Sequence, residues 1–247
     1  MDITAEMLFY RLSERHRLRR EYIGTPGFAV RGIRFWRTGE KLEENILYLL
    51  EDGTNLDKVS GRNPGIFLLS ASSLDEGDNF LPKDTYAVLE EKMARKLQVE
   101  LLELLGALTR WDARFYEAAI HRESAERIMA WGGEMLKWAY AVIDLDMKIL
   151  YHTPNYQEFA GARADQVPQE ITQELMMNPD FHAVAKLRES FYYFEENNGL
   201  DALCGNIFLG GAYYARVVMY VGEKGTRVPA GAKSIFERFV LHLEELL

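Results

Sequence analysis

Residues 139–161 read AYAVIDLDMKILYHTPNYQEFAG, and this stretch decides how the second half of the chain folds. Two short apolar runs, AYAVID and MKILYH, lie on either side of a polar segment that begins at Asp144. Apolar and β-branched runs favour strands, and aspartate favours turns because its side chain bonds to nearby backbone amides. The pattern therefore predicts a β-hairpin that leads into a helix-like segment.

More strand patterns follow this hairpin. SFYYFEE (190–196) predicts a third strand, and ALCGNIFLGGAYYARVVMYVGE (202–223) predicts a second hairpin, because Gly210 and Gly211 tolerate the positive φ angles of a two-residue turn. Strict alternation places Tyr214, Arg216, Val218 and Tyr220 on one face of the last strand, and Tyr213 on the other. GAKSIFERFVLHLEELL (231–247) has helical spacing and reaches its last residue without a cap, which suggests a fragment of a longer chain.

The sequence pattern of the first half of the chain predicts a small α/β domain. Thr4 is a plausible N-cap for a helix over about 5–15, and short apolar runs at 28–36, 46–53 and 65–73 predict strands. Pro82 and Asp84 then mark a helix start, after which apolar residues recur every three or four positions. The members of this stripe are Tyr86, Leu89, Met93, Leu97, Leu101, Leu104, Leu108 and Trp111.

The expected class is therefore α+β, with three parts. Residues 1–81 form a small N-terminal α/β domain, residues 82–138 form long connecting helices, and residues 139–247 form an antiparallel sheet with flanking helices. Gly106 and the pair Gly132-Gly133 are expected kinks or breaks in the connector. The apolar stripe of the connector either packs on its own domain or pairs with a second copy, and we favour dimerisation because the stripe lies between two domains.

Composition restricts the possible partners. The 247 residues include 48% hydrophobic and 12% aromatic residues, enough for sizeable cores, and the net charge of −9 argues against nucleic acid as a partner of this chain. Cys204 is the only cysteine, which precludes an intrachain disulfide and fits a reducing cytoplasm. The sequence has neither a secretory leader nor an apolar run of about 20 residues, so we expect a cytoplasmic chain with no membrane partner.

Candidate catalytic and metal-binding groups are weak. Asp144 and Asp146 form an acidic pair, but they lie where the hairpin turns, and the histidines lack the spacing of a zinc site. Cys204 lies in an apolar strand, which favours a buried hydrophobic role. The basic cluster RLSERHRLRR (11–20) is expected to be a solvated helix end. The sequence lacks the GxSxG, P-loop and GxGxxG motifs, so we predict no catalytic residues, no metal and no cofactor.

Two alternatives remain open. One is an enzyme whose acid and base lie far apart in the sequence, such as Glu158 or Glu174 with His152 or His182. The other is a scaffold without a ligand, whose interior is filled by its own tyrosine and methionine side chains. Alternation alone does not separate a ligand cavity from an ordinary core.

The stretch AVIDLDMKILYHTPNYQEFAG resembles the first hairpin and following helix of PAS domains, with Asn155 and Gly161 at the corresponding places. The run MMNPDFHAVAKLRESFYYFEENNGLDALCGNIFLGGAYYARVVMYVGE and the helix after it are similar to the sensory region of PucR/CdaR-type bacterial transcriptional regulators. This resemblance implies an N-terminal α/β domain, a helical segment and a PAS/GAF-like domain ahead of a helix-turn-helix. Since no helix-turn-helix follows within the sequence, DNA binding is implied only for a longer parent protein.

We therefore expect a non-catalytic module that senses a small metabolite and forms homodimers through helices of residues 83–138. The expected ligand-binding residues are Tyr151, Asn155, Tyr192, Asn206 and Arg216. Arg216 is the most informative of them, because an arginine on a mostly apolar sheet face either extends to solvent or pairs with a carboxylate, including that of a ligand.

Overall fold

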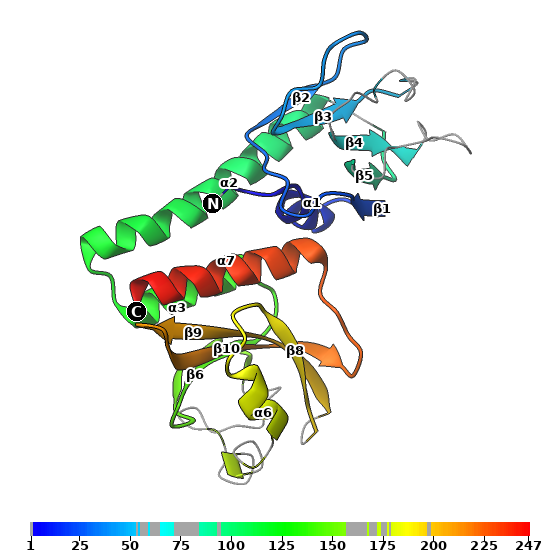
Figure 1. The fold of residues 1–247 in the computed structure, drawn as a ribbon. Coiled ribbons are helices and arrows are strands. Elements are labelled where there is room, and N and C mark those ends of the chain that lie inside the picture. The colour runs from blue at the N-terminus through cyan, green and yellow to red at the C-terminus, as the bar shows by residue number, and fades with distance from the viewer. Residues whose placement is uncertain are drawn as a thin grey trace. The chain divides into compact units, whose positions relative to one another are not determined.

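The computed structural model contains two five-stranded sheets with helices packed on them (Figure 1). The residues that it describes are 2–52, 54, 59, 65–71, 84–92, 95–156, 167, 172–173, 177, 179–196 and 199–247. The chain divides into an N-terminal unit, Met1–Asp112 with Pro229–Ser234, and a C-terminal unit, Ala113–Val228 with Ile235–Leu247. Both units combine helices and strands, so the expected α+β class is confirmed.

The N-terminal unit is built on a sheet with the strand order β1-β5-β4-β3-β2. Its elements are α1 (Ala5–Ser13), β1 (Leu18–Ile23), β2 (Gly32–Phe35), β3 (Ile46–Leu50), β4 (Ile66–Ser70), β5 (Thr85–Leu89) and the first part of α2 (Arg95–His121). Strands β2 to β5 are parallel, and β1 is an antiparallel edge strand. The helix predicted over 5–15 and the three strands predicted before residue 74 are confirmed, with shorter bounds.

The helix start predicted at Pro82 and Asp84 is wrong. Thr85–Leu89 forms strand β5, and the helix that follows is α2; Pro82 and Met93 lie outside the described residues. The segment TYAVL is a fully buried apolar run, and such a run fits a parallel strand as well as a helix. Asp84 has another role, because its Oδ1 accepts a 2.8 Å hydrogen bond from the amide of Gly65 and so joins the start of β5 to the start of β4.

The basic segment 11–20 also differs from the expected solvated helix end. α1 covers only its beginning, and Leu18–Ile23 forms the edge strand β1, antiparallel to β5. Charged side chains are common on edge strands, because they discourage pairing with other chains. Near the turn between α1 and β1, His16 Nε2 lies 2.9 Å and Arg15 Nη1 3.2 Å from the carboxylate of Glu100 on α2. The N-terminal part of α2 is thus fastened within this unit.

The C-terminal unit is built on an antiparallel sheet with the strand order β7-β6-β10-β9-β8. Its elements are the second part of α2, α3 (Ala125–Ala130), the 3-10 helix η3 (Trp131–Glu134), β6 (Tyr140–Asp144), β7 (Ile149–His152), α6 (Pro179–Val184), β8 (Phe191–Glu195), β9 (Leu200–Leu209), β10 (Ala212–Glu223) and most of α7 (Ala230–Leu246). Both predicted hairpins, the third strand and the last helix are confirmed. Gly210 and Gly211 have φ angles of 58° and 84°, as the predicted turn requires.

Helix α2 is uninterrupted at Gly106, where a kink or break was predicted, whereas Gly132 and Gly133 lie in η3. One side of α2 is buried along the length of the helix. The buried residues on this side are Leu97, Leu101, Leu104, Leu108, Trp111, Phe115 and Ala118. The helical part of the predicted apolar stripe therefore packs within its own chain and is not free for a partner. Among the described helices, none combines the length and apolar character needed to cross a membrane.

The two faces of the C-terminal sheet are covered differently. α7 runs along one face (Figure 1), where Gly205 of β9 closely approaches Phe236 and Val240. On the same face the ring of Tyr140 packs against Phe239, with centroids 5.6 Å apart. α6 lies at the other face, over a core cluster. The buried members of this cluster are Ala139, Ala141, Met147, Ile149, Tyr156, Val167, Ala202, Cys204 and Tyr220.

The packing of α7 on β9 can be tested at Gly205. A Cβ atom there would lie 2.7 Å from Val240 Cγ2 and 3.2 Å from Phe236 Cε1, so Gly205→Ala is expected to lower the free energy of unfolding by about 1–3 kcal/mol. Urea denaturation followed by circular dichroism measures the change. Gly133→Ala is the matched control, because its Cβ would meet only ordinary contacts at 3.9 Å. A Gly205→Ala variant as stable as the control would contradict the close approach.

Candidate functional site

Arg216 on β10 is a charged side chain that is only 3% exposed. It lies in the middle strand of the C-terminal sheet, on the face away from α7. Its Nε donates a 2.8 Å hydrogen bond to Oδ1 of Asn206, the residue directly opposite on β9. Burial of a guanidinium is unfavourable unless its charge and its N–H groups find partners.

Three aromatic rings surround the guanidinium of Arg216. Its Cζ lies 4.5 Å from the ring centroid of Phe181, 5.2 Å from that of Phe191 and 5.6 Å from that of Tyr213. These rings come from α6, β8 and β10, respectively. Their faces attract the positive charge, but an aromatic face does not replace a hydrogen-bond acceptor. We call the set of Arg216, Phe181, Phe191, Tyr213 and Asn206 the Arg216 site.

The Arg216 site has unused hydrogen-bonding capacity. Nη2 of Arg216 is buried and has no hydrogen-bond partner among the described residues, and none of their carboxylates forms an ion pair with this guanidinium. A buried polar group without a partner costs about 1–3 kcal/mol, and more when it is charged. An acceptor that carries negative charge would satisfy both the donor and the charge.

Asn206 connects Arg216 to the end of α6. Its side chain is 2% exposed, and its Nδ2 donates to the carbonyl oxygens of Val184 at 2.7 Å and Leu187 at 2.9 Å. With Oδ1 accepting from Arg216, the amide uses both of its donors and its acceptor. One side chain thus joins β9, β10 and the segment that ends α6.

A β-bulge brings Tyr213 to the same face as Arg216. The register of β10 against β9 shifts between Tyr213 and Ala215, which leaves Tyr214 as an extra residue. Strict alternation predicted that Tyr214 shares the face of Arg216 and that Tyr213 lies opposite, and this was wrong because the bulge reverses the side of every residue before it. The predicted common face of Arg216, Val218 and Tyr220 holds for the part of β10 between its two register shifts.

Of the five predicted ligand-binding residues, Asn206 and Arg216 are in contact. Tyr151 lies on the α7 face, where its ring is 5.8 Å from that of Tyr140. Tyr192 is also on that face, since it pairs with Leu203, and its hydroxyl accepts a 3.2 Å hydrogen bond from the amide of Val228.

Asn155 is half-buried in the turn after β7, and no hydrogen bond joins it to the described residues of the Arg216 site. Gly161, which with Asn155 carries the resemblance to PAS domains, lies outside the described residues. The predicted set therefore does not form one site, because Tyr151 and Tyr192 lie on the opposite face of the sheet from Asn206 and Arg216. The strand register that decides these faces cannot be read from the sequence.

Phe181, Phe191 and Tyr213 were missed. Phe191 pairs with Cys204, so alternation along SFYYFEE places it on the face of Arg216 once the register of β8 is known. Phe181 belongs to a segment outside the sheet, and no periodicity in the sequence indicates its position. The usable signal was an arginine in the middle of a strand rich in aromatic residues.

Other candidate groups have structural roles. Oδ1 of Asp144 accepts hydrogen bonds from the amides of Asp146 at 2.9 Å and Lys148 at 2.8 Å, so the side chain of Asp144 shapes the turn. Within the described part of the chain, no group of three or more metal-binding side chains occurs. His152 Nδ1 lies 2.9 Å from the carbonyl oxygen of Thr153. The carboxylates proposed as catalytic partners, those of residues 158 and 174, lie outside the described residues.

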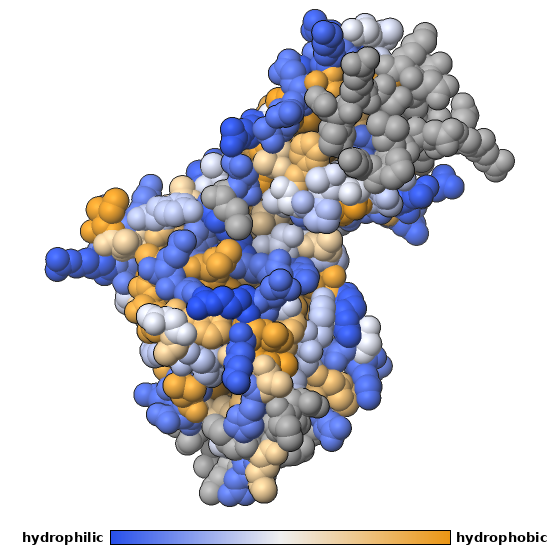
Figure 2. All heavy atoms as spheres, viewed as in Figure 1, coloured by the Kyte–Doolittle hydropathy of each residue, from blue (hydrophilic) through white to orange (hydrophobic). Residues whose placement is uncertain are grey.

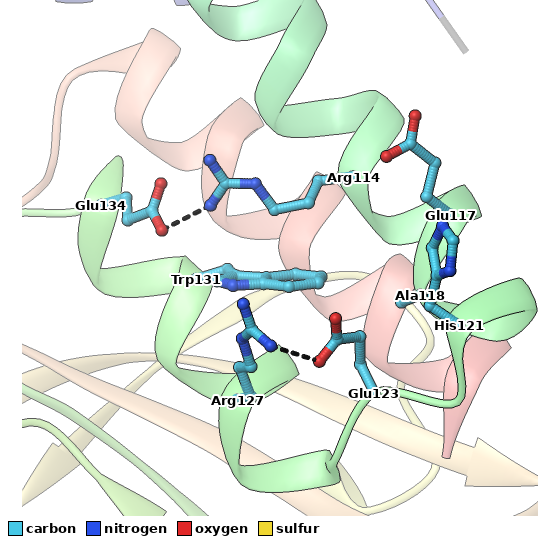
Figure 3. Close-up of a pocket in the computed structure, with 8 residues that line it drawn as sticks. All are labelled: Arg114, Glu117, Ala118, His121, Glu123, Arg127, Trp131 and Glu134. Carbon is cyan, nitrogen blue, oxygen red and sulfur yellow. Dashed lines mark hydrogen bonds and ion pairs between the residues drawn. The ribbon is translucent and has the colours of Figure 1, made fainter.

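A half-open cleft of about 540 Å³ lies at the end of α2 (Figure 3). Its lining residues are Arg114, Glu117, Ala118, His121, Glu123, Arg127, Trp131 and Glu134. The indole of Trp131 lies between Arg114 and Arg127, and these arginines form ion pairs with Glu134 and Glu123, respectively. Since both guanidinium groups already have carboxylate partners, the cleft is a weaker candidate for an anion site than Arg216. On the surface of the C-terminal unit seen in Figure 2, hydrophilic and hydrophobic residues are interspersed.

The role of Asn206 can be tested by Asn206→Ala. The change leaves Arg216 Nε and two carbonyl groups without their partner, so the free energy of unfolding should fall by about 2–4 kcal/mol. Amide exchange of residues 181–187 should also become faster. The matched control is Asn155→Ala, with an expected change within about 0.5 kcal/mol. Unchanged exchange in this segment would show that Asn206 does not hold it.

Cys204 is expected to be unreactive in the folded chain. Burial raises the pKa of its thiol from the ordinary 9.0 to about 12, so only about one thiol in ten thousand is ionised at pH 8. The raised pKa favours the folded state below pH 9, and this contribution is lost as the pH rises toward 12. A disulfide reagent such as DTNB should therefore label the thiol at pH 8 only after unfolding in urea. Rapid labelling of the folded chain would contradict the burial.

Comparison with known proteins identifies no family for this chain. No family model matches the sequence. No curated protein matches it either. The chemical role of the Arg216 site therefore depends on its own geometry.

Proposed function

We propose that this chain is the non-catalytic sensory module of a PucR-like bacterial transcriptional regulator and that it binds a small carboxylate-bearing metabolite at the Arg216 site. The observation that carries the proposal is the buried guanidinium of Arg216, whose Nη2 has no partner among the described residues. A carboxylate would supply the missing acceptor and the missing negative charge.

The surroundings of Arg216 favour a small ligand with one negative charge. Among the described residues, Arg216 supplies the one guanidinium that lies among these three rings, and the net charge of the chain is −9, which repels anions of high charge. Phe181, Phe191 and Tyr213 offer apolar surface beside the charge, as is typical of sites for small metabolites. A hydrogen bond between charged groups is stronger here than in water, because the surroundings have a low dielectric constant.

A signal can leave the site through Asn206. A ligand that repositions the guanidinium of Arg216 also acts on the amide that holds the carbonyls of Val184 and Leu187. Ligand binding would then favour one packing of the end of α6 on the sheet, which is a shift in the population of existing conformations. In a cytoplasmic regulator of the resembled family, this change would control a DNA-binding domain of the longer protein.

The arrangement of the C-terminal sheet supports the PAS/GAF-like part of the proposal. The first hairpin, β6 and β7, lies beside the last strand, β10, and a helix covers one face while the Arg216 site occupies the other. This arrangement is compatible with the resemblance of residues 141–161 to the first hairpin of a PAS domain. The proposal predicts that sensing depends on the side of the sheet that faces α6.

Thermal denaturation with pairs of probes tests the proposed site. Benzoate and hexanoate are compared with their neutral amides, and at least one carboxylate should raise the Tm in a saturable way while its amide does not. At about 100 times the Kd the expected increase is about 5–10 °C. Arg216→Met removes the charge but keeps most of the volume, and it should abolish the increase.

Lys148→Met is the control, because it removes an exposed positive charge from the β6–β7 turn and should leave the increase unchanged. The same rise in Tm in the Arg216→Met variant would remove Arg216 from the site. Stabilisation by an amide as large as that by its carboxylate would show that charge is not what the site recognises.

A further inference from the structure

The side of α2 that faces away from the core carries an apolar stripe of its own. Ten large hydrophobic side chains are exposed among the described residues, and four of them, including the 78% exposed Ile120, lie on this one side of α2. Small or weakly polar residues occupy the positions between them. The stripe consists of Val99, Leu102, Gly106, Thr109, Ala113, Tyr116 and Ile120, and we call it the outer stripe.

The outer stripe has the spacing of a helix–helix contact. Its residues alternate by three and four positions, which is the repeat that keeps one side of a helix against a partner helix. Most of it lies opposite the buried side of α2, which starts with Leu97 and Leu101. Tyr116 stands at its edge, where its hydroxyl accepts a 2.8 Å hydrogen bond from Arg238 of α7. Since α2 is one uninterrupted helix, these positions follow from helix geometry alone.

Unpaired charges of alternating sign accompany the outer stripe. Lys96, Glu103, Arg110 and Glu117 follow one edge of it at intervals of seven residues. None of the four has an ion-pair partner in the described part of the chain, whereas nearby Glu100 is paired with Arg15. Charges at such flanking positions decide the partner and the orientation of paired helices.

We infer that the outer stripe is a self-association surface on which α2 packs antiparallel against α2 of a second copy. In this orientation Glu103 lies beside the partner subunit's Arg110, and Lys96 lies beside the partner subunit's Glu117. The twofold axis repeats both pairs. Gly106 lies opposite the partner subunit's Thr109 near this axis, where small side chains let the helices approach closely.

The charges select this orientation over the parallel one. In a parallel pair, Asp112 on the other edge of the stripe would lie beside the partner subunit's Glu117, and like charges repel. The Arg110 guanidinium would meet Leu105 of the partner subunit and gain no carboxylate. Burial of the apolar side chains supplies affinity in either case, and the charge pattern supplies orientation.

Sedimentation velocity of charge-reversal variants tests the inference. The wild-type chain should dimerise, and either Glu103→Arg or Arg110→Glu should weaken dimerisation about tenfold, because each change turns two attractive contacts into repulsive ones. The double variant E103R/R110E should dimerise like the wild type, since it exchanges the two charges. An equimolar mixture of the two single variants should form heterodimers, for the same reason.

Glu44→Arg is the matched control, because Glu44 is an exposed glutamate outside α2 and its reversal should leave dimerisation unchanged. Val99→Asp should abolish dimerisation by placing a charge in the stripe. A wild-type chain that stays monomeric at all concentrations, or a dimer insensitive to both single reversals, would overturn the inference. The surface does not involve the Arg216 site, so Arg216→Met should dimerise normally whether or not the proposed function is correct.

Discussion

The C-terminal unit depends on three hydrogen bonds made by a single amide, that of Asn206. Its oxygen accepts from Arg216, and its nitrogen donates to two carbonyls that follow α6, so one side chain fixes the strand pair and the segment over it. An asparagine suits this position because it has both an acceptor and two donors, which neither a carboxylate nor a hydroxyl provides. A buried arginine is tolerated next to it because the oxygen of Asn206 and three aromatic rings partly replace water.

The elements fixed by local chemistry were predictable. The pair Gly210-Gly211 specifies its own turn, and the hairpin at Asp144 specifies another, so β6, β7, β9 and β10 follow from neighbouring residues alone. The first sheet was harder because its parallel strands pair with distant segments. Thr85–Leu89 is an apolar run that fits two periodicities, and only the sheet around it determines that it is a strand. Strand β1 was not predicted, because it begins within a basic segment whose charges suggested a solvated helix end.

The site was predictable only in part, for a related reason. Arg216 and Asn206 stand out as polar residues in apolar strands, and pairing across the Gly210-Gly211 turn brings them together. Tyr151 and Tyr192 lie on strands whose register cannot be read from the sequence, and a shift of one residue changes the face. Phe181 reaches the guanidinium from outside the sheet, and the rest of the segment before it falls largely outside the described residues. The pairing of Arg216 with Asn206 could thus be anticipated from the sequence, but the aromatic residues around them could not.

The bulge at Tyr214 has a consequence for how such a protein diversifies. The bulge exists because β10 has one residue more than β9 between two paired positions. One residue inserted between Ile207 and Phe208 of β9 would give Tyr214 a partner, restore strict alternation, turn Tyr213 toward α7 and put Tyr214 on the face of Arg216 instead. A gain of one residue opposite the bulge is therefore a small genetic step that changes which aromatic side chain lies beside Arg216. If the Arg216 site binds the proposed ligand, such a change offers relatives of this chain a route to new ligand preferences that leaves the rest of the sheet in place.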